Sequence, residues 1–395
     1  MELLEFDCDN YDKKQTLIVY GTGAFGNIVR YCLEKRGIVP DYYVDESGKG
    51  RFYGVPIISI DQLTEIYYKE HPIILLAVGA SIKEVALKLH KNKIDVVYEI
   101  YQLLEEIKDM GDLLDPVFEN RYQYFYVQQR FINYDKLVLA SLDVVVTEKC
   151  SLKCEKCSNL MQYYQHPKNF NGEDIKTSLD KVLNVVDVIY ELRILGGEPF
   201  MNPDFYSLIE HYSKHDKIKK IAILTNATIF PDEEKLQKLV NSKVKIWLSD
   251  YGKLSTKFFE WVDWCKKNKV EYYISKLKKW QDLGRLERHN YSPTEIKYIY
   301  ETCECKDCPV LMDGKLYNCP YAANAANLGA LYKDEAELDA LVLDEERNLR
   351  ERMKKFLYER DYLMACHYCD GRNTRRASVE PCAQIPKPLE YERRS

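Results

Sequence analysis

The segment Cys150-Ser-Leu-Lys-Cys154-Glu-Lys-Cys157 places three thiols within eight residues. It directly follows the apolar run Leu142–Thr147, as expected of a loop at the carboxyl end of a strand. Three thiolates on a four-iron cluster leave one iron without a protein ligand, and such an iron can bind a bidentate amino acid. The alternative is a structural zinc loop, which needs a distant fourth ligand such as His166.

Strand-like apolar runs alternate with helical spacers on both sides of this loop. Those before it are Thr16–Tyr20, Asp41–Asp45, Ile73–Val78 and Val96–Tyr101, and those after it are Val188–Leu195, Lys220–Leu224, Val244–Leu248 and Glu271–Ser275. Strands that alternate with helices predict an α/β fold with parallel sheets. We expect four parts, namely a Rossmann-like domain at 1–110, a helical connector at 111–140, a core at 141–301 and a loop-rich, metal-pinned domain at 302–395.

Composition narrows the class of protein. A chain of 395 residues with 46% hydrophobic and 30% charged residues is expected to be soluble, globular and built from two or three domains. Its net charge of −5 offers no basic surface for nucleic acid. The sequence contains neither a signal-like start nor a long apolar run, so we expect a cytoplasmic protein without a membrane partner. The chain has thirteen cysteines, most of which fall in two groups, and this favours metal ligation over a disulfide framework.

A second motif follows the next predicted strand, Gly196-Gly197-Glu198-Pro199. Glycines let the backbone approach a ligand closely, and a carboxylate complements an ammonium group. The cysteine loop and this motif together resemble the radical SAM superfamily, from about Leu142 to Asp282. The resemblance implies a partial (β/α)6 TIM barrel and a [4Fe-4S] cluster on Cys150, Cys154 and Cys157. It also implies that an electron donor such as flavodoxin or ferredoxin drives cleavage of S-adenosylmethionine to a 5′-deoxyadenosyl radical.

The resemblance extends to residues that would hold S-adenosylmethionine. Gly196, Gly197 and Glu198 would meet the methionine amino group, with Glu198 accepting a hydrogen bond. Residues at later strand ends match places where related enzymes contact ribose and the methionine carboxylate: Thr225, Asn226, Ser249 and Asp250. Lys156 stands where many relatives carry an aromatic residue. Its backbone atoms, and not an aromatic side chain, would therefore contact the adenine. Candidates for a general base are Asp250, Tyr251 and Arg285.

The second cysteine group begins with Cys303, Cys305 and Cys308 and continues beyond Gly314. It resembles the auxiliary-cluster region called twitch or SPASM, in which a cysteine, here Cys319, follows a glycine by five positions. The resemblance implies one auxiliary [4Fe-4S] cluster with the ligands Cys303, Cys319, Cys366 and Cys369, or with Cys308 or Cys382 as a replacement. A zinc ribbon is the competing interpretation, because Cys-x2-Cys pairs suit zinc equally well.

The first strand is followed by Gly21-Thr-Gly23-Ala-Phe-Gly26 and a predicted helix, with Asp45 located 19 positions beyond Gly26. Amide groups at such a helix start can hold a pyrophosphate. The later segment Gly54–Asp61 resembles the amino-terminal nucleotide-sugar-binding domain of some sugar acetyltransferases and other surface-polysaccharide proteins. A turn without a ligand is the alternative.

Together these features predict an enzyme that abstracts hydrogen from a small molecule, a sugar or nucleotide-sugar, and oxidises, epimerises or rearranges it in surface-polysaccharide biosynthesis. Two alternatives remain open at this point. One is a peptide or protein maturase of the same superfamily, and the other is a non-catalytic iron–sulfur sensor.

Overall fold

The computed structural model describes residues 1–79, 81–101, 103, 132–133, 135–276, 279–306, 308–343, 348–372 and 378–394. The chain forms two compact units, Met1–Ala140 and Ser141–Ser395. The helical connector predicted at 111–140 lies largely outside the described residues.

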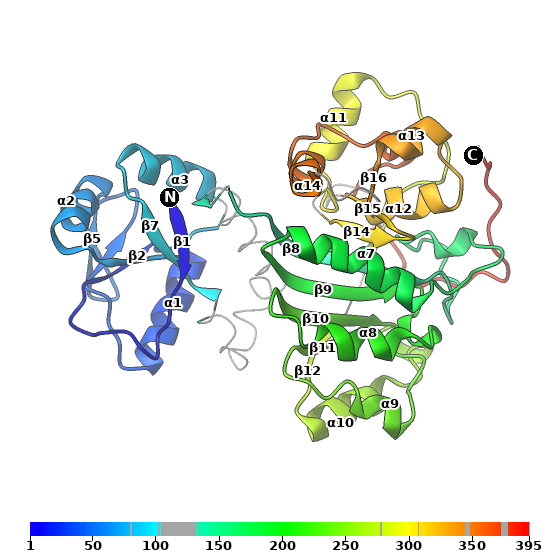
Figure 1. The fold of residues 1–395 in the computed structure, drawn as a ribbon, viewed down its shortest axis with the longest axis horizontal. Coiled ribbons are helices and arrows are strands. Elements are labelled where there is room, and N and C mark those ends of the chain that lie inside the picture. The colour runs from blue at the N-terminus through cyan, green and yellow to red at the C-terminus, as the bar shows by residue number, and fades with distance from the viewer. Residues whose placement is uncertain are drawn as a thin grey trace. The chain divides into compact units, whose positions relative to one another are not determined.

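The first unit is a sheet of seven strands, with helices packed on it (Figure 1). Its strands are β1 (Glu2–Glu5), β2 (Leu17–Tyr20), β3 (Tyr42–Val44), β4 (Arg51–Phe52), β5 (Val55–Ile58), β6 (Ile73–Leu76) and β7 (Val96–Glu99). Its helices are α1 (Ala24–Lys35), α2 (Ile60–Glu70) and α3 (Ile82–Lys91). The spatial order is β1-β7-β6-β2-β3-β5-β4, and the pairings are parallel except for β4 with β5.

All four residues of β2 and of β6 are buried, as expected for central strands covered on both faces. The sequence pattern missed the two-residue strand β4 and the longer strands β1 and β5. In β1 only Leu3 is buried, and β5 contains Pro56, which is depleted in strands. Neither strand therefore carries a strong periodic signal.

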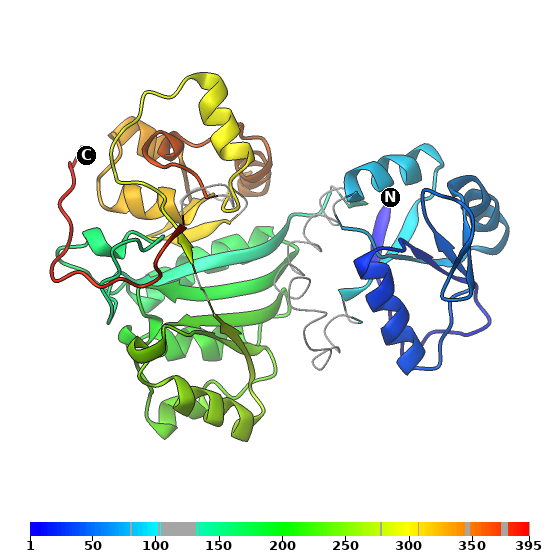
Figure 2. The ribbon, with the colours of Figure 1, turned by 180° about the vertical axis from the view of Figure 1, so that it is seen from behind.

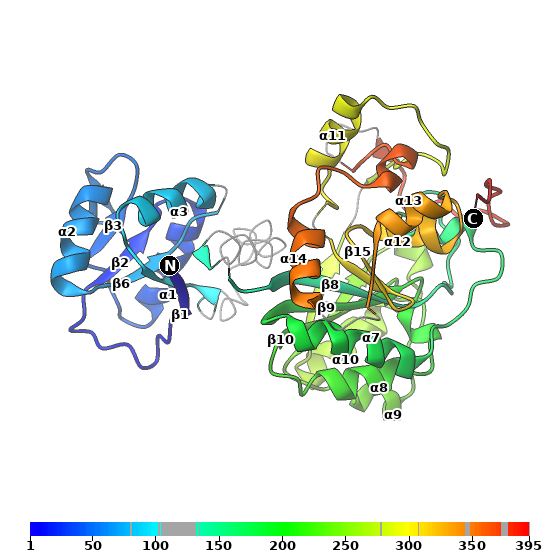
Figure 3. The ribbon, with the colours of Figure 1, turned by 45° about the horizontal axis from the view of Figure 1, so that its top comes forward.

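The second unit is built on an eight-stranded sheet with the order β12-β11-β10-β9-β8-β14-β15-β16. Its parallel strands are β8 (Val138–Thr147), β9 (Val188–Gly196), β10 (Ile218–Thr225), β11 (Val244–Ser249), β12 (Glu271–Ser275) and β14 (Val310–Met312). The helices of this half are α7 (Gly172–Val185), α8 (Phe205–Tyr212), α9 (Glu233–Gln237) and α10 (Phe258–Asn268), of which α7, α8 and α10 lie along one face of β8 to β12 (Figure 3). The predicted α/β class is confirmed, and the sheet is open across the described strands.

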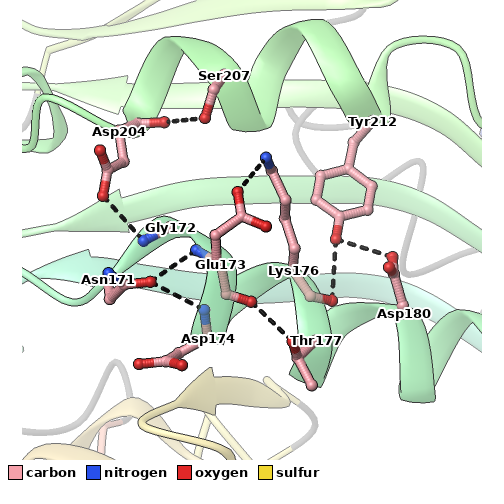
Figure 4. A network of polar contacts seen from close by, with 10 residues as sticks. All are labelled: Asn171, Gly172, Glu173, Asp174, Lys176, Thr177, Asp180, Asp204, Ser207 and Tyr212. Carbon is pink, nitrogen blue, oxygen red and sulfur yellow. Dashed lines mark hydrogen bonds and ion pairs between the residues drawn. The ribbon is translucent and has the colours of Figure 1, made fainter.

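The packing of α7 against α8 shows how the sequence fixes this helical layer (Figure 4). The side chain of Asn171 caps α7 by accepting hydrogen bonds from the amides of residues 173 and 174 at 2.9 and 3.2 Å. The carboxylate of Asp204 accepts from the Gly172 amide at 2.9 Å, and a Cβ at Gly172 would lie 2.7 Å from the Asp204 Cβ. At the other end, the Tyr212 hydroxyl donates to Asp180 at 2.9 Å.

The region after residue 302 differs from the loop-rich domain that the sequence predicts. It adds β14, β15 (Lys315–Tyr317) and β16 (Ala340–Val342) to the core sheet and contains α12 (Pro320–Asn327), α13 (Lys333–Leu338) and α14 (Leu349–Tyr358), preceded by α11 (Pro293–Glu301). Buried tyrosines form much of its core, and the hydroxyl of the fully buried Tyr368 donates to Glu335 at 2.6 Å. Apolar packing, and not metal alone, therefore stabilises this region. The sequence pattern did not reveal this core, because tyrosine and alanine, and not a periodic run of larger aliphatic residues, form much of it.

A short sheet joins distant parts of this unit. Strand β13 (Trp280–Gln281) pairs antiparallel with β17 (Ser378–Val379). Across the part of the chain that the structure describes, we find no helix with the length and apolarity that crossing a bilayer requires.

Candidate functional site

The loop Cys150–Cys157 leaves the carboxyl end of β8 and is held by the segment that follows β9. The Gly197 amide donates to the Thr147 carbonyl at 3.0 Å, and the Glu198 amide donates to the Lys149 carbonyl at 2.8 Å. A Cβ at Gly197 would lie 2.1 Å from the Lys149 oxygen, and one at Gly196 would lie 2.2 Å from the Thr147 oxygen. Both glycines are therefore needed for the close approach of these two backbones.

Glu198 is fully buried and joins the ends of two strands. Its carboxylate accepts from the Thr225 hydroxyl at 2.8 and 2.9 Å and from the Asn226 amide at 2.9 Å. Burial raises the pKa of Glu198 to about 7, although the amide and hydroxyl donors oppose the shift. The Asn226 side chain lies 3.1 Å from the Ser151 hydroxyl and 3.6 Å from the Cys150 sulfur, so it links the carboxylate to the cysteine loop.

The end of β11 brings further predicted residues to this region. The Ser255 hydroxyl contacts the carbonyls of Ser249 and Asn226, both at 2.9 Å. Sequence reasoning missed Ser255, because an isolated serine has no recognisable spacing. Asp250 accepts from the Gly252 amide at 3.0 Å, which makes it a turn residue. Arg285, the third candidate for a general base, is exposed.

Lys156 forms an ion pair with Asp282 at 2.8 Å. Aromatic side chains beside the cysteine loop come instead from distant positions, since Tyr251 and Trp280 pack against the buried group of Leu152, Cys154 and Cys382. The rings of Tyr251 and Trp280 meet edge to face, with centroids 5.8 Å apart. Tyr251 and Trp280 thus supply the aromatic surface that Lys156 does not, although no local sequence motif predicts their position beside the loop.

Cys382 occupies a different place from the one that the sequence suggested. It was an alternative ligand of the auxiliary group, whereas its sulfur lies 3.1 Å from the sulfur of Cys154. The segment around Cys382 runs beside the loop after β8 (Figure 2). This placement removes Cys382 from the auxiliary set.

The second group of cysteines lines a pocket between α11, α12 and the segment 363–371. Its lining includes Cys303, Cys319, Cys366 and Cys369, together with Tyr300 and Tyr321. These are the four cysteines that the sequence resemblance implies as ligands. Burial raises the pKa values of the Cys319 and Cys369 thiols well above the ordinary value, so the free thiols are protonated and metal binding would have to release protons.

Cys308, the remaining alternative ligand, does not line this pocket. Its sulfur lies 4.0 Å from the Glu304 carbonyl. The neighbouring Cys305 lies 3.9 Å from the Arg372 guanidinium. No three His, Cys, Asp or Glu side chains of the described residues already converge as they would on a single ion.

One face of the strands β8 to β12 carries charged residues instead of aliphatic ones. Arg193 lies 2.7 Å from Glu191 and 3.9 Å from Asp143. One carboxylate oxygen of each acid is buried and has no hydrogen-bond partner among the described residues. Burial raises the pKa of Asp143 to about 6. Buried carboxylate oxygens that accept no hydrogen bond are costly, and such a cost is typical of a site that meets a polar ligand.

The same face continues with lysines and aromatic rings on the later strands. Lys220 pairs with Glu271 at 3.1 Å. The Lys245 ammonium lies 5.4 Å from the ring centroid of Trp247 and 5.6 Å from that of Tyr273, and the two rings are 4.8 Å apart. Strand register places these residues on one face, because Lys245 pairs with Glu271 and Trp247 pairs with Tyr273.

In the first unit, the glycine turn lies where the order of the strands reverses. The chain proceeds from β2 to β3 on one side and later returns to β6 on the other. A Cβ at Gly21, whose φ is +120°, would lie 2.4 Å from the Ala77 carbonyl oxygen that follows β6. The Thr22 hydroxyl donates to Asp45, at the end of β3. Gly23 caps α1 and Gly26 lies in its first turn, close to the Gly21 carbonyl.

Residues 144–284 match the family model of the Radical SAM superfamily. The chain therefore carries a radical SAM domain over these residues.

Curated relatives match about two fifths of the chain. The GTP 3′,8-cyclase of Clostridium acetobutylicum is 31% identical over 176 residues, which are 40% of this chain and 55% of that protein. The probable GTP 3′,8-cyclase of Methanococcus maripaludis is 26% identical over 175 residues, 44% of this chain and 54% of that protein. The chain thus spans about half the length of these relatives.

Solved structures resemble the chain more distantly. A structure of anSMEcpe with bound AdoMet is 17% identical, covers 65% of this chain and 94% of that chain, and has a TM-score of 0.39. Streptococcus suis SuiB bound to S-adenosylmethionine is 16% identical over 62% of this chain and 72% of that chain, with a TM-score of 0.32.

The radical SAM domain implies a [4Fe-4S] cluster and S-adenosylmethionine, and the residues present fit both. Three cysteines on one short loop supply the thiolates, and the glycine backbone at 196–197 leaves no room for side chains at the loop. The buried carboxylate of Glu198 complements an ammonium group. When bound, these groups together supply the 5′-deoxyadenosyl radical.

Proposed function

We propose that the protein is a radical SAM enzyme that abstracts hydrogen from a sugar or nucleotide-sugar and thereby oxidises, epimerises or rearranges it. The observation that carries the proposal is the glycine turn Gly21–Gly26 at the strand-order reversal of the first unit. In open α/β sheets, ligands bind at this point, outside the carboxyl ends of the strands. A radical SAM domain on the same chain as such a unit favours a nucleotide-linked substrate.

Two further observations support this substrate class. The charged face of β8 to β12 offers several hydrogen-bonding groups beside the ring pair of Trp247 and Tyr273. A polyhydroxylated ring is recognised by such a combination of polar groups and aromatic surface. In addition, the relatives in Clostridium and Methanococcus are named for a reaction of the nucleotide GTP.

Within this proposal, the pocket of Cys303, Cys319, Cys366 and Cys369 holds one auxiliary [4Fe-4S] cluster. Four cysteines that line a single pocket support a cluster with a full set of cysteine ligands. Such a cluster could accept an electron from a substrate radical, which favours net oxidation. A reductant such as flavodoxin or ferredoxin would donate an electron to the cluster on Cys150, Cys154 and Cys157.

Binding of nucleotide-sugars to the full chain tests the proposal. We expect calorimetry to detect binding of at least one UDP-, GDP- or ADP-sugar. Asp45→Asn should weaken this binding by about ten- to a hundredfold, because the loss of a charged hydrogen-bond acceptor costs about 1.5 to 3 kcal/mol. Asp95→Asn, at an exposed position directly before β7, is the matched control and should bind normally. The same sugar should stimulate formation of 5′-deoxyadenosine. If no member of the panel binds the wild-type chain, the proposed substrate class is wrong.

Glu198 is proposed to accept a hydrogen bond from the methionine ammonium of S-adenosylmethionine. Three donors already reach its carboxylate, namely the Thr225 hydroxyl and the amides of Asn226 and Phe200. A carboxylate has about four acceptor positions, so one remains for the ammonium.

This role predicts a pH dependence of S-adenosylmethionine binding. The raised pKa of about 7 means that Glu198 is mostly protonated at pH 6 and mostly ionised at pH 7.5. Because the ionised form is the better partner of an ammonium, the affinity should rise about eightfold over this interval, in proportion to the ionised fraction. Glu198→Gln should bind more weakly and lose the pH dependence. Equilibrium dialysis under anaerobic conditions measures both, and an unchanged pH profile in Glu198→Gln would assign the dependence to another group.

A further inference from the structure

The loop that carries the cluster cysteines is bridged by a segment more than two hundred residues away. The Glu155 amide donates to the Ala383 carbonyl at 2.8 Å, and the Ile385 amide donates to the Lys153 carbonyl at 2.9 Å. These two bonds form an antiparallel bridge between Cys154 and Gln384. The backbone of the loop is therefore held against the segment 383–385.

The same segment delivers a fourth thiol to the loop. The sulfurs of Cys154 and Cys382 are 3.1 Å apart, and the two residues are only 8% and 4% exposed. Cys382 adopts a left-handed backbone conformation with φ +59°, which is rare for a residue with a side chain. The Gln384 side-chain amide lies 3.3 Å from the Cys154 sulfur and 3.5 Å from the Cys382 sulfur. Backbone pairing, an unusual φ and a shared donor thus converge on one sulfur pair.

We propose that Cys154 and Cys382 form a reversible disulfide that closes the cluster site of the iron-free protein. The oxidant is a low-molecular-weight disulfide such as oxidised glutathione. One cysteine thiolate attacks the disulfide and releases one glutathione thiolate, and the second cysteine thiolate displaces the other glutathione from the mixed disulfide. Two protein thiols are oxidised to one disulfide, and one glutathione disulfide is reduced to two thiols.

The consequence follows from the number of thiolates. With Cys154 in a disulfide, the loop offers two thiolates where the cluster needs three. Cluster assembly then waits for a reductant, and the disulfide, once formed, keeps the Cys154 thiol from oxidation to a sulfinic acid. Cys382 itself is not a ligand in this scheme, and it becomes a free thiol once iron occupies Cys154.

The test uses the iron-free full chain, treated with oxidised glutathione or with dithiothreitol and then freed of both. We expect non-reducing peptide mapping to find a Cys154–Cys382 linkage only after oxidised glutathione. Reconstitution should then load about four fewer irons than after dithiothreitol. Cys382→Ser should show no linkage and should load the same amount of iron after either treatment. Cys265→Ser, a fully buried cysteine of α10, is the matched control and should behave as the wild type.

Three results would overturn the proposal. The first is the absence of the linked peptide from the oxidised wild-type protein. The second is a Cys382→Ser variant in which oxidised glutathione lowers iron loading as strongly as it does in the wild type. The third is a Cys382→Ser variant that takes up less iron than the wild type under fully reducing conditions, because Cys382 would then be a cluster ligand.

Discussion

Replacing Cys150, Cys154 and Cys157 by alanine is expected to remove about four iron and four sulfide atoms and to leave about four of each in the protein. The reason is that the two sets of cysteines lie at separate places in the fold. The triad follows β8, whereas Cys303, Cys319, Cys366 and Cys369 line the pocket beside α11 and α12. Formation of 5′-deoxyadenosine should fall below detection in this variant, because the cluster that would donate an electron to S-adenosylmethionine has been removed.

The measurement is iron and sulfide counting after anaerobic reconstitution, with zinc determined in parallel. Alanine at Cys8, Cys32 and Cys265 provides the matched triple variant, because these three cysteines are buried in apolar surroundings. It should retain the full iron content. If the triad variant lost all of its iron, the model of two independent clusters would be wrong. If it contained stoichiometric zinc, the auxiliary site would be a zinc site and not an iron–sulfur cluster.

The second large effect is expected from Gly197→Ala. The new Cβ would lie 2.1 Å from the Lys149 oxygen and 2.8 Å from the Cys150 Cβ, so the backbone that carries the first cysteine would have to move. A displacement of about 1 Å at a reacting centre can cost a hundredfold in rate, and we expect at least this loss in 5′-deoxyadenosine formation. The cluster content should also fall.

Gly37→Ala separates this local effect from a general loss of stability. Gly37 has a left-handed φ of +64° and open space around its missing Cβ. Alanine there should cost about 1 kcal/mol of stability and leave the rate of 5′-deoxyadenosine formation unchanged. If Gly197→Ala retained the rate of the wild type, the backbone contact between the glycine motif and the cysteine loop would have no role in the reaction.

The sequence predicted those features that depend on local order along the chain. The strands β8 to β12 were readable because their apolar runs are long. The pocket cysteines were implied by the resemblance to the auxiliary-cluster region, which the spacing of Gly314 and Cys319 supports. In contrast, β14 joins the core sheet beside β8, and no local pattern encodes which strand a short segment will pair with.

The parts of the site that the sequence could not predict come from long-range contacts. Trp280 reaches the cysteine loop through β13, and Cys382 reaches it through the bridge to Cys154. Ser255 joins the ends of β10 and β11 through its hydroxyl. A single tryptophan, cysteine or serine carries no spacing that reveals its partner. Only the folded chain brings each of them to the loop.

The bridge between the cysteine loop and the segment 383–385 also bears on the order of events during synthesis. The two sulfurs of this contact belong to residues 228 positions apart, so the loop waits for most of the chain to be translated before it gains its partner. A nascent chain that has emerged only as far as the core sheet presents its cysteines on an unsupported loop. Iron delivered at that stage would meet a cysteine loop that lacks its contact with the segment 383–385. A long pause in translation before residue 382 should therefore lower the yield of correctly metallated protein.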